Sequence, residues 1–142
     1  MIDPQPPLPR GLSLLGWSGT LPFIATLAVA ALEPGYRSAV LAAFVAYGAV
    51  ILSFLGGARW GSALARASPP LRFVEAVLPS LLAFAALMVL HQWTWALSLL
   101  AAGFLLWMVV DVFDPQWSPA YRRLRLHISV LVLALHAGWL LV

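Results

Sequence analysis

The chain has 142 residues, 63% of them hydrophobic and only 9% charged, with eight arginines, no lysine and no cysteine. Without cysteine, disulfides, thiolate metal sites and cysteine nucleophiles are excluded. The formal net charge of +3 comes from basic residues too few and too dispersed for a nucleic-acid footprint, so no nucleic-acid partner is predicted. A chain this short and this apolar has room for several membrane spans and no soluble domain, which makes membrane lipid its first expected partner.

The apolar segments predict an all-α integral membrane bundle of five transmembrane helices. A hydrocarbon core about 30 Å thick requires roughly 20 apolar residues in helix. Backbone groups in lipid must pair within their own segment. Windows such as Leu81–Leu90 are apolar on every face, unlike the alternating strands of a membrane barrel. The expected spans cover residues 12–32, 39–65, 74–90, 95–113 and 126–142.

The segment before the first span predicts an exposed arm. Residues 1–11 are proline-rich and lack apolar periodicity, whereas residues 12–142 are expected to form a single transmembrane domain. Ala28-Val29-Ala30 resembles a signal-peptide cleavage site, but the apolar stretch before it is longer than the roughly 7–15 residues of a signal core. A first membrane span is therefore favoured. Pro79 is expected to kink the third span near its start.

The arginines predict the orientation of the bundle. Arg37 lies on one side of the five-span arrangement and Arg59 lies inside a span. The other six fall on the opposite side: Arg10, Arg66, Arg72, Arg122, Arg123 and Arg125. Short loops rich in arginine stay in the cytoplasm. The amino terminus is therefore predicted to be cytoplasmic and the carboxyl terminus outside, in a multi-pass protein of the bacterial inner membrane.

The second span carries a small residue at every fourth position. These residues are Ala49, Ser53, Gly57, Gly61 and Ala65. Such a ridge lets another helix approach closely where lipid gives no hydrophobic drive for association. It predicts a helix–helix interface, either within the bundle or with a partner. The alternative is chance in an alanine-rich chain.

Arg59 is the only basic residue inside a span, so it is expected to have an acidic partner. Asp111 enters the membrane from the same side at a similar depth, and Glu75 begins the third span there, with Asp114 as a substitute acceptor. A structural ion pair that fixes the register of the bundle is the favoured interpretation. The functional alternative is a proton or anion pathway built on Arg59 and Asp111.

The remaining polar residues form no recognisable catalytic pattern, so no enzyme activity is predicted. His127 and His136 are about 13 Å apart along a helix and cannot share a metal ion. An outer pair of His91 and His136 is the weaker possibility. No metal and no cofactor are predicted, although a bound lipid or quinone stays open, with Trp60, Trp107 and the histidines lining its site.

Three stretches resemble a known family. They are Leu15–Phe23 (LGWSGTLPF), Tyr47–Gly61 (YGAVILSFLGGARWG) and Tyr121–Arg125 (YRRLR). They are similar to a bacterial multi-span membrane family of unknown function that also includes the mitochondrial transmembrane protein 69 of animals. The resemblance implies a small protein of bacterial inner or mitochondrial membranes. It implies no catalytic residue.

Two main functions follow from these features. The first is a non-enzymatic accessory, structural or assembly subunit of a larger inner-membrane complex, with energy-transducing complexes as one example. The alternative is a small transporter or channel that moves protons or a small anion through Arg59 and Asp111, with Glu75 beside them. A lipid- or quinone-binding enzyme is a third and weaker interpretation.

Overall fold

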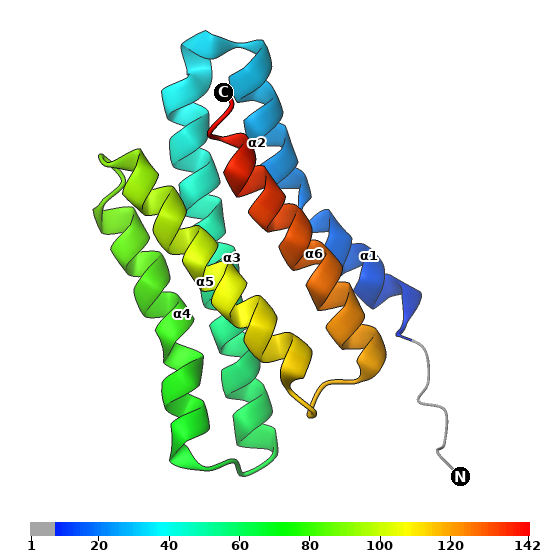
Figure 1. Cartoon of the computed structure of the whole chain (residues 1–142). Coiled ribbons are helices and arrows are strands. Elements are labelled where there is room, and N and C mark those ends of the chain that lie inside the picture. Colours follow the sequence, from blue (N-terminus) through cyan, green and yellow to red (C-terminus); the bar gives the residue numbers. More distant parts are fainter. Residues whose placement is uncertain (1–7) are drawn as a thin grey trace.

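The computed structural model describes residues 8–142, in which every regular element is a helix (Figure 1). Residues 1–7 of the predicted arm lie outside the described part, and Arg10 and Gly11 already belong to the first helix. The elements in chain order are α1 (Arg10–Ser18), α2 (Leu21–Leu32), the 3₁₀ turn η1 (Pro34–Tyr36), α3 (Arg37–Ala65), α4 (Pro70–Met88), α5 (Trp93–Phe113) and α6 (Pro119–Gly138). The predicted all-α class is confirmed.

The helices run up and down beside one another. The start of α1, the α3–α4 connection and the α5–α6 connection lie at one end of the bundle (Figure 1). The α2–α3 connection and the carboxyl terminus lie at the other end. We call the first the arginine end, because six of the eight arginines belong to the segments that meet there.

Four helical stretches are long and apolar enough to cross a membrane: Arg10–Leu32, Pro34–Ala65, Pro70–Met88 and Trp93–Phe113. Helix α6 has a comparable length, but three arginines lie within its first two turns. Four of the five predicted spans therefore have the length and hydropathy of a membrane helix. The crossing of the fifth stays a prediction.

The first predicted span is not one continuous helix. Helix α1 ends at Ser18 and α2 begins at Leu21, because Pro22 occupies the first turn of α2 and has no N–H to bond back to the preceding turn. The N–H of Thr20 instead donates to the carbonyl of Trp17 at 3.0 Å. The break lets α1 diverge from the direction of α2 (Figure 1).

The last helix begins seven residues earlier than the predicted start at residue 126. Ser118 caps it, since its hydroxyl accepts from the N–H of Tyr121 at 3.2 Å, and Pro119 occupies the first turn. Arg122, Arg123 and Arg125 are consequently helical rather than part of a loop. The other boundaries shift by a few residues, as where α4 begins at Pro70. Pro79 lies within an uninterrupted α4.

The buried face of α3 follows spacings of three and four residues. Its members include Val45, Gly48, Leu52, Leu55 and Arg59. Alternating steps of three and four keep residues on one face of a helix. Gly56 lies on the same face, where a Cβ atom would collide with the backbone oxygen of Ala76 on α4. This glycine therefore lets the backbones of α3 and α4 come into direct contact.

At its two glycines, the predicted ridge on α3 does not contact another helix of the bundle, so of the two alternatives an interface with a partner stays a prediction. Ala49 is buried, but Gly57, Gly61 and Ala65 are exposed. A Cβ atom on Gly57 or Gly61 would meet nothing within 4 Å. The reason is geometric: a row of residues four apart turns by about 40° per step around a helix with 3.6 residues per turn. The row therefore begins on the buried face at Ala49 and winds onto the outer surface.

An aromatic cluster fills the bundle toward the end opposite the arginine end. Phe44 contacts the ring of His136 at a centroid distance of 4.8 Å and that of Trp139 at 5.4 Å. Phe23 and Phe104 complete the cluster around His136. The Nδ1 atom of His136 lies 2.8 Å from the carbonyl oxygen of Val132 in its own helix. This histidine is thus a core residue held by its own helix and by aromatic rings.

Candidate functional site

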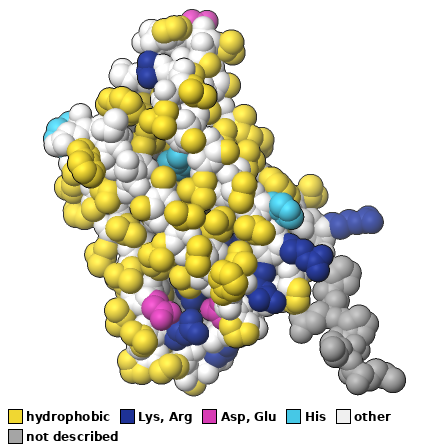
Figure 2. Space-filling view, viewed as in Figure 1, with side chains coloured by type: hydrophobic (Ala, Val, Ile, Leu, Met, Phe, Trp, Pro, Cys, Tyr) yellow, Lys and Arg dark blue, Asp and Glu magenta, His cyan; other side chains and the backbone are white. Residues whose placement is uncertain are grey.

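The candidate site is a network of charged side chains at the arginine end, which we call the ion network. Arg59 comes from α3, Asp111 from the last turn of α5 and Arg125 from the second turn of α6. Asp114 directly follows α5, and Arg72 and Glu75 come from α4. Figure 2 shows acidic and basic side chains together at this end of a largely apolar surface. Four helices therefore meet through their charges.

Asp111 is the centre of the ion network. Its Oδ1 accepts from Nη1 of Arg59 at 2.8 Å. Its Oδ2 accepts from Nε and Nη2 of Arg125 at 3.0 and 2.8 Å. Asp111 is only 4% exposed, and both arginines are buried. Charge-assisted bonds to two guanidinium groups satisfy a carboxylate that would otherwise be costly to bury.

Asp114 extends the ion network to α4. Its Oδ2 accepts from Nη2 of Arg59 at 3.1 Å and from Nη1 of Arg72 at 3.4 Å, while its Oδ1 accepts from the N–H of Gln116 at 3.0 Å. Arg72 also donates to Oε2 of Glu75 at 3.3 Å. Glu75 lies 3.8 Å from Nη2 of Arg59. Three guanidinium groups thus face three carboxylates, and the ion network has no net charge.

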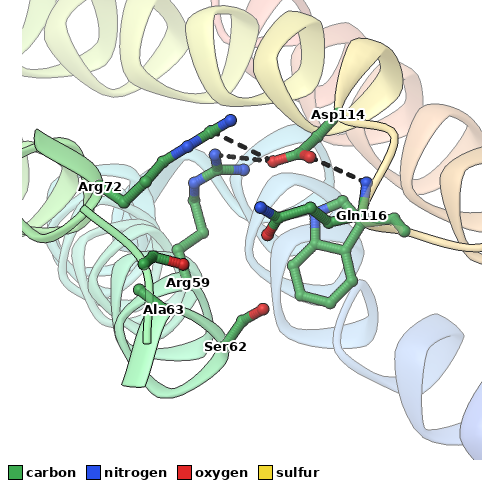
Figure 3. Close-up of a pocket in the computed structure, with 8 residues that line it drawn as sticks. Arg59, Ser62, Ala63, Arg72, Asp114 and Gln116 are labelled. Atoms are coloured by element: carbon green, nitrogen blue, oxygen red, sulfur yellow. Dashed lines mark hydrogen bonds and ion pairs between the residues drawn. The ribbon is translucent and has the colours of Figure 1, made fainter. Parts of the chain in front are cut away.

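A small polar cavity of about 10 Å³ adjoins the ion network. Figure 3 shows Arg59, Arg72 and Asp114 converging beside it, with Ser62 and Gln116 on its other walls. The hydroxyl of Ser62 is buried without a partner among the described residues. A cavity of this size holds at most about one water molecule.

The structure brings Arg59 together with every acidic residue that the sequence offered as its partner. Arg59 and Asp111 are in direct contact, and Asp114 and Glu75 are beside them. Sequence reasoning missed Arg125 and Arg72 as members, because it placed both in connecting loops. The Ser118-Pro119 pair is a helix-start signal that places Arg125 within α6.

The other orienting arginines lie nearer the surface. Arg10 and Arg123 are exposed. Arg66 donates to the carbonyl oxygen of Gln116 at 3.1 Å, and Arg122 donates to that of Val112 at 3.2 Å. Arg66 therefore joins the end of α3 to the α5–α6 connection, and Arg122 joins α6 to α5.

The aromatic and histidine residues suggested for a quinone site lie in different environments. Trp107 is buried in the core, while Trp60 is 42% exposed and packs against Phe73. His91 and His127 are exposed, and His136 lies in the aromatic cluster. Within residues 8–142, no group of three histidine, aspartate or glutamate side chains is placed to hold a metal ion.

Apolar helices of spanning length, tied together by buried ion pairs, define a multi-pass α-helical membrane protein. Residues 8–141 match the family described as "Protein of unknown function (DUF3429)", and the chain belongs to this family. It is 33% identical over 130 residues to transmembrane protein 69 of Xenopus tropicalis. That match covers 86% of this chain and 51% of the relative, so the chain spans about half of the relative's length. No solved structure matches. The resemblance inferred from the three sequence stretches is confirmed.

Proposed function

We propose that this protein is a non-enzymatic accessory or assembly subunit that packs against another protein of a larger membrane complex. The observation that carries this proposal is the outer face of α3. Gly57 and Gly61 leave open space beside the helix backbone. Small residues at such positions are what transmembrane helices use for close approach.

A second feature continues this face. A groove of about 340 Å³ lies between α3 and α4, lined by Ala49 and Ser53 of the small-residue row and by Ser80 and Ala83 of α4. Val50, Phe84 and Leu87 also line the groove, so a neighbouring helix would meet small side chains flanked by larger apolar ones. Hydroxyl groups in the groove can bond a partner helix across the interface.

The membrane arrangement that we propose has five spans, with α6 as the fifth. The arginines of its first two turns do not oppose insertion strongly, because Arg125 is paired with Asp111 and the others lie at the arginine end. That end would face the cytoplasm or its organellar equivalent by the positive-inside rule. The bacterial inner membrane is the proposed location.

We expect tags at the two termini to be found on opposite sides of the membrane. An amino-terminal tag should resist a protease added outside intact spheroplasts, whereas a carboxyl-terminal tag should be cleaved. A periplasmic loop tag placed after Gly35 serves as the positive control for protease access, since this exposed turn lies in the α2–α3 connection. Finding both termini on one side would contradict the five-span arrangement.

We expect the substitution Gly57→Leu to abolish association with the partner complex while leaving the isolated protein folded. The added side chain points into open space in the isolated subunit but would occupy the proposed interface. Co-migration in native gels of mild detergent extracts measures association, and circular dichroism measures the fold. Ala102→Leu, at an exposed position of α5, is the matched control. The proposal fails if wild-type protein migrates alone or if Gly57→Leu co-migrates normally.

The second candidate function is a small transporter or channel, and the buried ion network is the observation that favours it. Ionisable groups inside a membrane bundle often mark ion or proton pathways. Proteoliposomes containing a pH-sensitive dye test this candidate. Proton flux that disappears in Glu75→Gln, a substitution at the partly exposed edge of the ion network, would favour transport over a subunit role.

A further inference from the structure

An apolar cavity of about 360 Å³ lies between α1, α3 and α6. We call it the wedge. Its walls include Leu12 and Leu15 of α1, Phe54 and Ala58 of α3, and Leu124 and Ile128 of α6. Leu15 is 73% exposed and Phe54 is 68% exposed, so the wedge is open toward the membrane.

The wedge exists because the first predicted span is broken. Helix α2, after the break, packs on α3, whereas α1, before the break, diverges and packs on α6. Gly16 permits this contact, since a Cβ atom there would lie 3.1 Å from Ile128 and 3.4 Å from Leu124. Helix α1 therefore does not cover the part of α3 around Phe54 and Ala58.

Basic residues flank one end of the wedge. Arg10 precedes the lining residue Leu12 by two residues at the start of α1, and Arg123 directly precedes the lining residue Leu124 of α6; both arginines are exposed. Arg122 is already bonded to the carbonyl oxygen of Val112. Figure 2 shows arginine side chains gathered beside these ends of α1 and α6. The guanidinium of Arg125 also borders the wedge but is already bonded to Asp111. The wedge thus joins an apolar slot to a positively charged rim.

We propose that the wedge binds one acyl chain of an anionic phospholipid, whose phosphate is held by the arginines of its rim. Basic pockets between membrane helices bind anionic head groups. The size of the wedge suits a lipid chain, since sites for small ligands measure about 300–1,000 Å³. Two turns of a partner helix, about 10 Å across, would need roughly twice the space. This inference does not depend on the proposed subunit role.

Native mass spectrometry of the purified full chain tests the lipid site. The protein is given equal amounts of phosphatidylglycerol and phosphatidylcholine with identical acyl chains. We expect wild-type protein to retain one phosphatidylglycerol in clear preference to phosphatidylcholine. Ala58→Phe should lose this bound lipid, because the added ring fills the slot. Ala102→Phe, at an exposed position of α5, should retain it.

A second variant tests the rim and does not depend on the folding of Ala58→Phe. The double substitution Arg10→Gln and Arg123→Gln removes two exposed charges outside the ion network. It should weaken phosphatidylglycerol binding by about fivefold for each arginine, whereas Arg37→Gln at the opposite end should not. The inference is overturned by equal retention of the two lipids, by unchanged lipid binding in a folded Ala58→Phe, or by an unchanged preference in the double variant.

Discussion

Replacing Asp111 by asparagine is expected to lower the free energy of unfolding by about 3–5 kcal/mol. Asp111 is the only residue of the ion network that the Arg125 guanidinium contacts. It also accepts the shorter of the two hydrogen bonds that Arg59 donates. Without the negative charge of Asp111, the buried guanidinium groups of Arg59 and Arg125 are no longer balanced by an equal number of carboxylates. Thermal unfolding in detergent, followed by circular dichroism, measures the loss.

Glu75→Gln is the matched control for Asp111→Asn. Glu75 is a carboxylate of the same ion network, but 35% of its side chain is exposed. Ion pairs near the surface contribute about 0–1 kcal/mol, so this variant should unfold close to the wild-type temperature. Equal unfolding temperatures for wild type and Asp111→Asn would show that the ion network does not stabilise the bundle.

The geometry of Asp111 also changes what a double substitution should do. For an isolated pair, Arg59→Leu with Asp111→Asn would restore much of the stability lost by either change. Here Asp111 also pairs with Arg125, and Arg59 also pairs with Asp114. The double variant strands these outer partners. We therefore expect it to be less stable than Arg59→Leu alone.

Replacing Gly56 by valine is expected to destabilise the isolated protein by about 1–3 kcal/mol. Any Cβ atom at this position collides with the backbone oxygen of Ala76, and the ring of Pro79 lies 3.2 Å away. Neither group can move as freely as the end of a side chain. Helices α3 and α4 must separate, which loosens the contact that also positions Arg59 near Arg72 and Glu75.

Gly57→Val is the neighbouring control for Gly56→Val. Both changes add the same side chain to the same helix, with the same cost in helix propensity. At Gly57, however, the added atoms meet nothing within 4 Å. Thermal unfolding of the two variants in one detergent should separate them by several degrees. If Gly57→Val were the less stable variant, Gly57 rather than Gly56 would lie on the buried face of α3, which would contradict the structure.

The sequence alone determined the all-α class and the approximate positions of the long helices, and it placed Arg59 and Asp111 at one level. The length and apolarity of the segments require helices, because backbone groups in lipid must bond within their own segment. The depth of Arg59 and Asp111 followed from the rise of a helix and from the side on which each enters. Their contact, at 2.8 Å, joins residues 52 positions apart in sequence.

Only the tertiary structure decided which face of α3 turns inward. Two rows of residues that include glycines were available on this helix, one through Gly48, Leu52 and Gly56 and one through Gly57 and Gly61. The first row faces α4 and α5, where a Cβ atom on either glycine would meet a neighbouring helix, and the glycines of the second row face outward. The choice depends on packing between whole helices, which composition cannot reveal.

The membership of the ion network was likewise a tertiary outcome. Arg125 reaches Asp111 because Ser118 and Pro119 start α6 early enough to place it in the second turn of a helix packed against α5. Arg72 reaches Asp114 because α4 begins at Pro70 and packs closely on α3 at Gly56. Sequence shows which charges must find partners, since an unpaired buried charge is too costly to persist. Which partner each one finds depends on the rotation and register of neighbouring helices, and only packing between helices sets these.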